Sequence, residues 1–230
     1  MIFNGFQKMT LLDFPGKVAC TLFTGGCNFR CPFCHNAVLV ENPELAEEIS
    51  EQFVLDFLKK RQGLLDGVCI TGGEPLLQSD LEQFIIKVKE MGYAVKLDTN
   101  GSYPEKLISL CEKGLIDYVA MDVKSSMEKY PLCTGIKDYN TAKVEQSIDY
   151  LLRGRIDYEF RTTVADELHT PEDIETLAKR IEGAKRYFLQ NFVDSGNILG
   201  ENLSPVPHEK LVFMWSIASK YVQNCEIRGE

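Results

Sequence analysis

Three cysteines stand close together near the amino terminus, in the stretch GCNFRCPFCHN at 26–36. Cys27, Cys31 and Cys34 follow the spacing C-x3-C-x2-C, and His35 comes directly after the third cysteine. Thiolates bind soft metals and take part in redox chemistry, so the stretch predicts a metal or redox site. Four kinds of site use such residues: covalently attached haem, zinc, a redox dithiol and an iron–sulfur cluster.

The surroundings of the three cysteines favour the iron–sulfur cluster. A zinc site commonly needs a second ligand pair, but the other five cysteines stand alone, and His35 is poorly placed to bind the same tetrahedral ion as Cys34. A dithiol would leave Cys27 unexplained, and haem attachment normally takes place outside the cytoplasm. Three thiolates on one short loop suit a [4Fe–4S] cluster that keeps one iron open for a small chelating molecule.

Composition limits the partners and the compartment. The 230 residues are 44% hydrophobic and 26% charged, with a net charge of −9, so nucleic acid is a poor candidate partner. Apolar runs stay short of the about 20 residues that span a bilayer, so we expect no membrane association. The amino-terminal residues lack the pattern of a secretory signal. We therefore expect a cytoplasmic protein whose cysteines are free thiols or metal ligands.

Apolar residues predict alternating strands and helices along the chain. Short apolar runs alternate with stretches in which apolar residues recur at helical spacing. Strands are expected at 18–23, 67–71, 94–99, 116–124, 157–164 and 185–192. Helices are expected at 50–62, 79–92, 103–114, 139–154, 170–183 and 208–224. Ser50 is a candidate N-cap, and Pro171 suits a first helical position.

Six strand–helix units in succession predict an α/β fold with a parallel sheet and right-handed crossovers. Six units are too few to close an eight-stranded barrel, so we expect an open (β/α)6 partial TIM barrel in a single domain. An N-terminal segment at 1–17 would precede the partial barrel at 18–192, and a loop and helix at 193–230 would follow it. The loops after the carboxyl ends of the strands, the cysteine loop among them, would converge on one mouth.

The cysteine loop resembles the signature of the radical S-adenosylmethionine (SAM) superfamily, C-x3-C-x-aromatic-C, with Phe33 as the aromatic residue. The resemblance implies a [4Fe–4S] cluster on Cys27, Cys31 and Cys34. In this superfamily the cluster donates an electron to SAM, and the resulting 5′-deoxyadenosyl radical abstracts hydrogen. The cleavage itself requires no protein acid or base, so we expect no catalytic residue of that kind.

The segment GGEP at 72–75 follows the second expected strand, where a GGE segment of this superfamily holds the methionine amino group of SAM. DTNG (98–101) and MDVK (121–124) follow the third and fourth strands, and this pair resembles the activating enzymes of glycyl-radical enzymes. The residues that the resemblance places around SAM are Phe33, Asn36, Gly72, Gly73, Glu74, Asp98, Thr99, Asn100, Asp122, Lys124 and Arg161.

Individual roles follow from the same resemblance. Asp98, Thr99 and Asp122 would lie near the SAM carboxylate, as candidate ligands of a monovalent cation. Lys124 would contact that carboxylate directly, because an ammonium group suits it. Arg161, in FRTTV, matches an activase position near SAM.

The segment LLDFPGKVACTLFTGGCNFRC resembles the amino-terminal part of these activases, and the match places Asp13, Phe14 and Gly16 near a docked glycyl loop. The chain is most similar to activating proteins of anaerobic ribonucleoside-triphosphate reductase. Such a protein abstracts hydrogen from a glycine Cα of its partner enzyme, with an electron from a flavodoxin or a ferredoxin-type donor. One departure concerns the histidine that some activases carry near the last strand, where this chain has Gln190, Asn191 and Phe192.

Other functions and purely structural roles stay open. The alternative enzyme is a radical SAM enzyme acting on a small molecule, similar to 7-carboxy-7-deazaguanine synthase, and the alternative without catalysis is a zinc or iron–sulfur binding module. Glu74 suits the start of a helix, Asp13 suits a turn, and Asp122 with Lys124 suits a surface ion pair. Arg161 also suits a structural ion pair. Cys20 and Cys69 fit buried strand positions, whereas His169 and His208 are expected in solvent.

Overall fold

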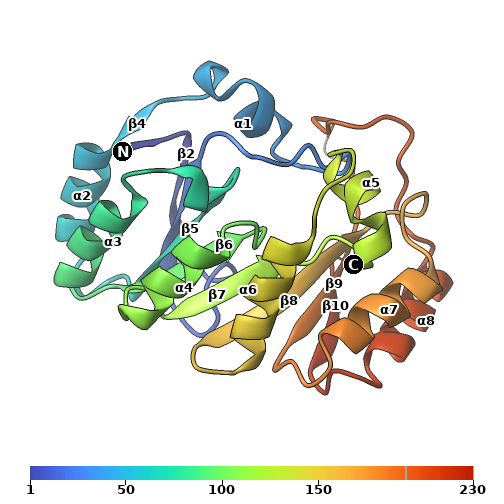
Figure 1. Ribbon diagram of the computed structural model, residues 1–230. Helices are drawn as coiled ribbons and strands as arrows, with labels where there is room; N and C mark the ends of the chain where they lie inside the picture. The colour runs from blue at the N-terminus through green and yellow to red at the C-terminus, as the bar shows by residue number, and fades with distance from the viewer. Residues whose placement is uncertain (195, 230) are drawn as a thin grey trace. The chain divides into compact units, whose positions relative to one another are not determined.

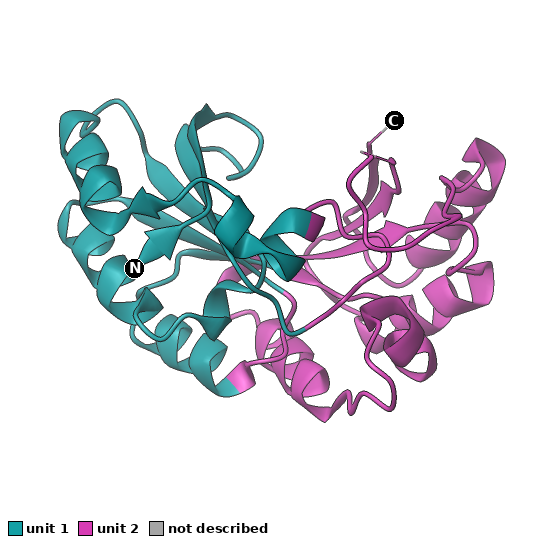
Figure 2. Ribbon diagram, turned by 90° about the horizontal axis from the view of Figure 1, so that it is seen from above, with its two compact units in different colours: residues 1–28, 38–99, 105–120 teal, residues 29–37, 100–104, 121–230 magenta. Residues whose placement is uncertain are grey.

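The computed structural model describes residues 1–194 and 196–229 (Figure 1). The chain forms two compact units, coloured separately in Figure 2. Unit 1 comprises residues 1–28, 38–99 and 105–120, and unit 2 comprises residues 29–37, 100–104 and 121–230. The cysteine loop passes from unit 1 into unit 2 after Asn28, and strand β7 begins in unit 1 and ends in unit 2.

Unit 1 contains a mostly parallel sheet with the strand order β2-β3-β5-β6, followed by the beginning of β7. Strand β2 is antiparallel to β3, whereas β3, β5 and β6 run parallel. These strands are β2 (Gly5–Thr10), β3 (Ala19–Thr24), β5 (Gly67–Gly72), β6 (Ala94–Thr99) and β7 (Tyr118–Asp122). A separate pair of short antiparallel strands joins β1 (Ile2–Phe3) to β4 (Ile49–Ser50).

Helices α2, α3 and α4 lie on one side of the unit 1 strands (Figure 1). Ser50 caps α2 as expected, because its hydroxyl accepts a hydrogen bond from the Phe53 amide at 3.2 Å. The α-helices are α1 (Ala37–Glu41), α2 (Glu51–Lys60), α3 (Leu81–Glu90) and α4 (Pro104–Glu112), and the 3₁₀ helices are η1 (Pro43–Leu45) and η2 (Pro75–Leu77).

Aromatic packing fills the amino ends of the unit 1 strands. Phe14 is 2% exposed and packs with Ala19, Ala94 and Tyr118, each at the first residue of its strand. The Phe14 and Tyr118 rings lie 6.1 Å apart. The face of the sheet that carries these residues therefore begins with an apolar layer, and its polar residues lie further along the strands.

Unit 2 continues with the end of β7 and the parallel strands β8 (Asp157–Val164), β9 (Tyr187–Asn191) and β10 (Cys225–Arg228). Helices α7 and α8 pack against each other beside these strands (Figure 1). Helix α7 begins at Pro171, and Thr170 and Asp173 form a capping box at its amino end. The helices of unit 2 are η3 (Met127–Lys129), α5 (Tyr130–Thr134), α6 (Ala142–Leu152), α7 (Pro171–Arg180) and α8 (His208–Ala218).

The α/β class and the open, mostly parallel sheet are confirmed. In the described sheet β2 pairs with β3 alone and β10 pairs with β9 alone, so the sheet is not closed into a barrel. All six expected strand–helix units are present. The single domain that the sequence predicts stays a prediction.

Three details of the predicted elements are wrong. The strand at 18–23 is not the first, because β1 and β2 precede it, and β2 breaks the parallel pattern because a short connection joins it to its neighbour β3. The strand at 185–192 is not the last, because β10 follows it. The closing helix ends at Ala218, not at 224, so that the chain can turn back and pair β10 with β9.

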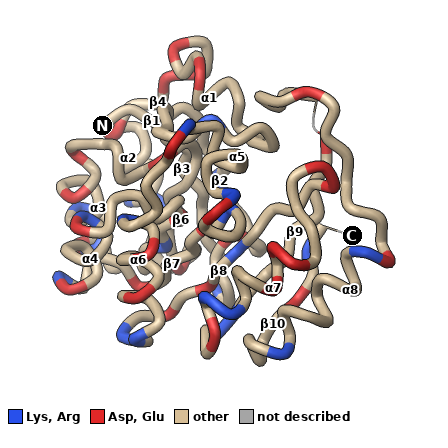
Figure 3. Tube along the Cα trace, turned by 45° about the vertical axis from the view of Figure 1, so that its right-hand side comes forward, with Lys and Arg blue, Asp and Glu red and all other residues tan. Residues whose placement is uncertain are grey.

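Two general features of the structure are the distribution of its charges and the length of its helices. Acidic and basic residues are interspersed along both units (Figure 3). None of the helices in the described part of the chain has both the length and the apolar character needed to cross a bilayer.

Candidate active site

The GGE segment and the first part of the cysteine loop are in backbone contact within unit 1. The amide of Gly73 donates to the carbonyl of Thr24, and the amide of Glu74 donates to the carbonyl of Gly26, each at 2.8 Å. A Cβ atom on Gly73 would overlap the Gly26 carbonyl oxygen, and Gly72 adopts φ +112°. Glycine is therefore required at 72 and 73 because two backbones approach each other closely.

Glu74 is fully buried and caps the 3₁₀ helix η2. Its Oε1 accepts hydrogen bonds from the Leu76 amide at 3.1 Å and from the Thr99 hydroxyl at 2.8 Å. Glu74 therefore has the helix-start role that the sequence also suggested for it. The role of Glu74 in binding SAM stays a prediction, and its geometry shows a carboxylate held rigidly between β5 and β6.

Asp98 and Asn100 have local partners after β6. Asp98 pairs with Lys96, two residues earlier on the same strand. Asn100 is 6% exposed, and its Oδ1 accepts hydrogen bonds from the amide of Ser102 at 3.0 Å and from its hydroxyl at 2.6 Å. These contacts close a tight turn directly after the strand.

The second part of the cysteine loop lies in unit 2, where helix α5 supports it. The amide of Arg30 donates to the carbonyl of Thr134 at 2.7 Å, and a Cβ on Gly135 would overlap the Arg30 carbonyl. The Phe29 ring lies 5.0 Å from Tyr139 and 6.5 Å from Tyr130. Helix α5 is absent from the elements that the sequence predicts, although Pro131 near its start and Gly135 at its end are signals for it.

The loop 193–207, as far as it is described, also contacts the cysteine loop in unit 2. The amide of Gly200 donates to the Pro32 carbonyl at 2.8 Å, and a Cβ on Gly200 would lie 2.6 Å from the Pro32 Cβ. His35 stacks on Phe192, with ring centroids 5.8 Å apart. Phe192 thus has a packing role in this part of the chain.

Asn191 is tied to the same loop. Its side chain exchanges two hydrogen bonds with the Val206 backbone, at 2.9 and 3.0 Å.

Phe33, the aromatic residue of the signature, is held between His169 and Lys124. Phe33 is 3% exposed, its ring lies 6.1 Å from the His169 ring, and the Lys124 ammonium lies 5.8 Å from its centroid. His169 is fully buried, so the expectation that it is solvated is wrong. The chain folds it inward because both ring nitrogens find backbone partners. His208 is exposed, as expected.

Asp122, Lys124 and Arg161 form an ion-pair group in unit 2. Arg161 Nε donates to Asp122 Oδ1 at 2.9 Å, and Lys124 Nζ donates to Oδ2 at 3.0 Å. Burial opposes the charged forms, but Arg161 and Lys124 outweigh it and hold the pKa of Asp122 well below its usual range. Burial likewise opposes the charge of Lys124, yet Asp122 raises its pKa above the ordinary value. Both groups are therefore ionised at neutral pH.

The donor chemistry of the cysteine loop fits an iron–sulfur cluster. The Cys34 amide donates to the Cys31 carbonyl at 3.0 Å, which folds these two ligand candidates into one turn. Burial raises the pKa of the Cys34 thiol, whereas the Asn36 backbone amide and the Lys124 charge favour its thiolate. An ammonium and an amide close to the thiols suit an anionic cluster.

The complete ligand set stays a prediction. Cys27 belongs to unit 1, whereas Cys31 and Cys34 belong to unit 2. Within residues 1–194 and 196–229, no three Cys, His, Asp or Glu side chains are already grouped as metal ligands. None of the eight cysteines, all of which lie in the described part of the chain, forms a disulfide, and Cys20 and Cys69 are fully buried, as expected.

The segment Asp13–Gly16 folds onto the strands of unit 1. The Thr21 hydroxyl donates to Asp13 Oδ2 at 2.5 Å, and the Lys17 amide donates to the Phe14 carbonyl at 3.1 Å. Gly16 has φ +71°, which closes this turn. The structure thus shows structural roles for Asp13, Phe14 and Gly16, and their contact with a substrate peptide stays a prediction.

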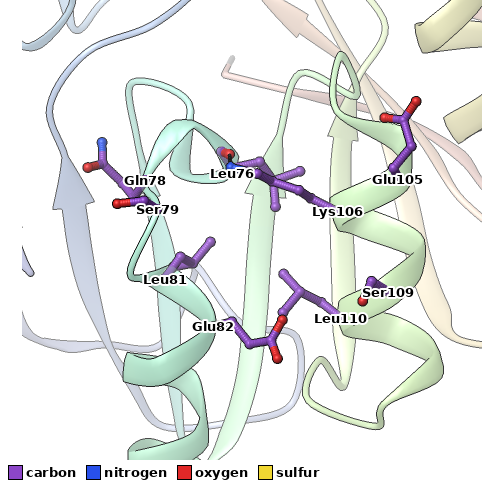
Figure 4. A pocket seen from close by; sticks show the side chains of 9 residues that line it. All are labelled: Leu76, Gln78, Ser79, Leu81, Glu82, Glu105, Lys106, Ser109 and Leu110. Atoms are coloured by element: carbon purple, nitrogen blue, oxygen red, sulfur yellow. Dashed lines mark hydrogen bonds between the residues drawn. The ribbon is translucent and has the colours of Figure 1, made fainter.

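A hollow of about 250 Å³ lies beside helices α3 and α4 in unit 1 (Figure 4). Its lining includes Leu76, Leu81 and Leu110, with Lys106 donating to the Leu76 carbonyl at 2.7 Å. The residues that the sequence predicts as site residues do not line it. The location of the active site at the strand ends stays a prediction.

Comparisons with known proteins identify the family of the chain. The profile of the Radical SAM superfamily matches residues 21–181. A protein of Methanocaldococcus jannaschii, provisionally named glycyl-radical enzyme activating enzyme MJ1227, is 34% identical over 233 residues, covering 98% of this chain and 95% of that protein. Pyruvate formate-lyase-activating enzyme of Staphylococcus aureus is 33% identical over 102 residues, covering 42% of this chain and 40% of that protein.

Solved structures agree on the fold. The chain superimposes on SuiB of Streptococcus suis, in a structure with bound S-adenosylmethionine, with a TM-score of 0.67 and 14% identity. The match covers 91% of this chain and 52% of SuiB, so this chain spans about half the length of that protein.

The chain belongs to the radical SAM superfamily, and within it to the family of glycyl-radical enzyme activating enzymes. It is therefore an enzyme of the radical SAM type, and the family implies a [4Fe–4S] cluster and SAM as its cofactors.

Proposed function

We propose that this protein generates a glycyl radical on a partner enzyme, and that the partner is anaerobic ribonucleoside-triphosphate reductase. The observation that carries the proposal is the match over nearly the whole chain to a protein named as a glycyl-radical enzyme activating enzyme. The choice of reductase rests on the resemblance of the amino-terminal segment and of the DTNG and MDVK motifs.

In the proposed site, Cys27, Cys31 and Cys34 hold the [4Fe–4S] cluster. The bound cluster and SAM together supply the reductive cleavage that yields the hydrogen-abstracting radical. Phe33 shields this part of the loop from water, because it is buried between His169 and the Lys124 side chain. The electron comes from a flavodoxin or a ferredoxin-type donor in the cytoplasm.

Charged residues orient SAM in this proposal. Lys124 neutralises the SAM carboxylate, for which an ammonium with three donors is suited. Asp122 and Arg161 fix the position of Lys124 through the contacts at 2.9 and 3.0 Å. The segment at Gly72, Gly73 and Glu74 binds the amino end of SAM, and its rigid backbone contacts with the cysteine loop support that role.

The remaining proposed contacts are with SAM and with the glycyl loop of the partner enzyme. Asn36, next to the ligand loop, and Thr99 with Asn100, after β6, contribute further SAM contacts. Asp13 and Gly16 lie along the path of the partner's glycyl loop, and the turn that they form on unit 1 presents a fixed surface for it. Phe14, which is 2% exposed, anchors this turn from below. The sequence suggested Asp98, with Thr99 and Asp122, as the surroundings of a monovalent cation, and the ion pair between Lys96 and Asp98 bears on that suggestion.

The test is anaerobic reconstitution with iron and sulfide, followed by dithionite, SAM and the reductase. We expect about four irons per chain and a glycyl doublet in the EPR spectrum. Cys27→Ala should lose the doublet, whereas Cys111→Ala, a thiol in α4 outside the predicted ligand set, should keep it. Release of 5′-deoxyadenosine without any glycyl signal, together with conversion of a small substrate to a deazaguanine product, would establish the alternative enzyme.

A further inference from the structure

A lysine is buried in the middle of strand β6, on the face of the sheet that carries the polar residues of unit 1. Lys96 is 2% exposed, and side-chain alternation places it on the same face as Asp98. Val95 and Leu97 point to the opposite face and are fully buried there. A lysine that is nearly fully buried requires a charged or polar partner, because an isolated ammonium is costly away from water.

The Lys96 ammonium lies beside groups that interact favourably with a positive charge. Its Nζ donates to Asp98 Oδ1, lies 3.9 Å from Cys69 Sγ, and lies 6.0 Å from the centroid of the Tyr118 ring. Cys69 Sγ in turn lies 3.7 Å from Asp98 Oδ1. A carboxylate, a sulfur atom and an aromatic face thus surround one ammonium group.

Strand register makes this arrangement a fixed part of the sheet. Cys69 on β5 is the register partner of Lys96 on β6, and Thr21 on β3 is the register partner of Cys69. Asp13 Oδ2 in turn accepts a hydrogen bond from the Thr21 hydroxyl at 2.5 Å. Because every member lies on a strand or on the turn bound to it, Lys96 has little freedom to leave Asp98.

The carboxylates expected around a monovalent cation each have a tethered cation already. In unit 1 the Lys96 ammonium contacts Asp98, and the Thr99 hydroxyl is used by Glu74. In unit 2 Asp122 is paired with both Lys124 and Arg161. A free alkali ion at Asp98 would be placed next to an ammonium, and like charges at such short range repel in a buried site.

We propose that the Lys96 ammonium is a built-in counter-ion of Asp98, and that this enzyme binds SAM without a free monovalent cation. The inference rests on the proposed function in so far as Asp98 lies beside SAM. Lys96 is a positioning residue: it touches Asp98 and not the cofactor, and it keeps the carboxylate neutralised and oriented. The sequence alone suggested the same carboxylate as part of a cation site.

The test compares chloride salts of potassium, sodium and tetramethylammonium at equal ionic strength. The reconstituted wild-type protein should show the same SAM dissociation constant and the same Tm in all three salts. In Lys96→Met the SAM dissociation constant should rise about tenfold in tetramethylammonium chloride, and potassium or sodium should reverse much of that rise. The Tm of the same variant should also increase with potassium or sodium, a response that a merely structural lysine would not produce.

Two controls make the result specific. Lys96→Met/Asp98→Asn removes both charges and should abolish the alkali-ion response. Lys89→Met removes another lysine–aspartate pair of unit 1, the Lys89–Asp117 pair at 2.7 Å, and should behave as wild type in all three salts.

Two results would overturn the proposal. One is wild-type SAM affinity or Tm that rises with potassium or sodium over tetramethylammonium. The other is a folded Lys96→Met protein without any alkali-ion response. If Lys96→Met does not fold, the SAM affinity and the Tm of the wild-type protein in the three salts decide the question by themselves. Neither readout depends on glycyl-radical formation, so failure of this proposal is distinguishable from failure of the proposed function.

Discussion

Arg161 on β8 and Asp122 at the end of β7 are joined side chain to side chain, with Nε of the arginine donating to Oδ1 of the aspartate at 2.9 Å. The other carboxylate oxygen of Asp122 accepts from Lys124 at 3.0 Å. Asp122 thereby fixes the direction of the ammonium that we propose for the SAM carboxylate. Three charges on neighbouring elements of unit 2 act together, so changing one should alter the position of the others.

Asp122→Asn should weaken SAM binding and leave the iron content unchanged. The amide cannot neutralise Lys124 and Arg161, so the ammonium loses the partner that positions it. We expect the SAM dissociation constant to rise about tenfold, measured by equilibrium binding to the reconstituted protein beside an iron assay. Asp149→Asn, which breaks the exposed pair with Arg180 at 2.7 Å, is the matched control and should bind SAM as wild type does. Unchanged affinity in Asp122→Asn would remove this aspartate from the proposed site.

His169→Ala should destabilise the protein and loosen Phe33. His169 Nε2 lies 2.8 Å from the Lys124 carbonyl oxygen, and Nδ1 lies 3.2 Å from the Ala165 amide nitrogen, so both ring nitrogens have backbone partners. Losing a buried group with two such partners costs about 1–3 kcal/mol of unfolding free energy. Urea unfolding measures this loss.

The companion variant His169→Gln separates the hydrogen bond from the packing. Its amide nitrogen can still donate to the Lys124 carbonyl, so we expect it to recover part of the stability and of the SAM affinity that His169→Ala loses. Equal losses in both variants would show that ring packing alone matters.

Acid should weaken the fold through His169. Burial lowers the pKa of this histidine below its ordinary value, so the folded state favours the neutral ring. The unfolded chain takes up a proton near pH 6.5. The stabilising contribution is therefore complete above that pH and is lost as the pH falls from there through the folded pKa. Urea unfolding between about pH 8 and pH 5 should show a decline that His169→Gln reduces; an identical decline in both proteins would assign it to other groups.

Gly73→Ala should be strongly destabilising, because a Cβ there overlaps the Gly26 carbonyl and the two backbones must separate. We expect a loss of about 2 kcal/mol or more in unfolding free energy and a lower iron content after reconstitution. Gly5→Ala is the matched control in the same unit: its Cβ would meet the Phe23 side chain at 3.2 Å, and this side chain can shift. A similar small loss in both variants would contradict the proposed close contact.

Local sequence signals predicted the regular elements well. The strands at 94–99 and 157–164 agree with β6 and β8 to the residue, because their apolar runs end at polar or turn residues. Ser50 and Pro171 marked the starts of α2 and α7, since capping depends on the first few residues of a helix alone. The edge strands β2 and β10 escaped prediction, because short, partly exposed strands depend on a neighbour for their hydrogen bonds.

The sequence by itself determined the spacing of the three cysteines, the succession of strands and helices, and hence the family to which the chain belongs. Tertiary structure alone decided that His169 is buried, that α5 supports the cysteine loop, and that Cys69 lies beside Lys96 and Asp98. The physical reason is the range of the interactions: capping and periodicity act within a few residues, whereas burial and contacts between strands arise only when segments distant in sequence become neighbours.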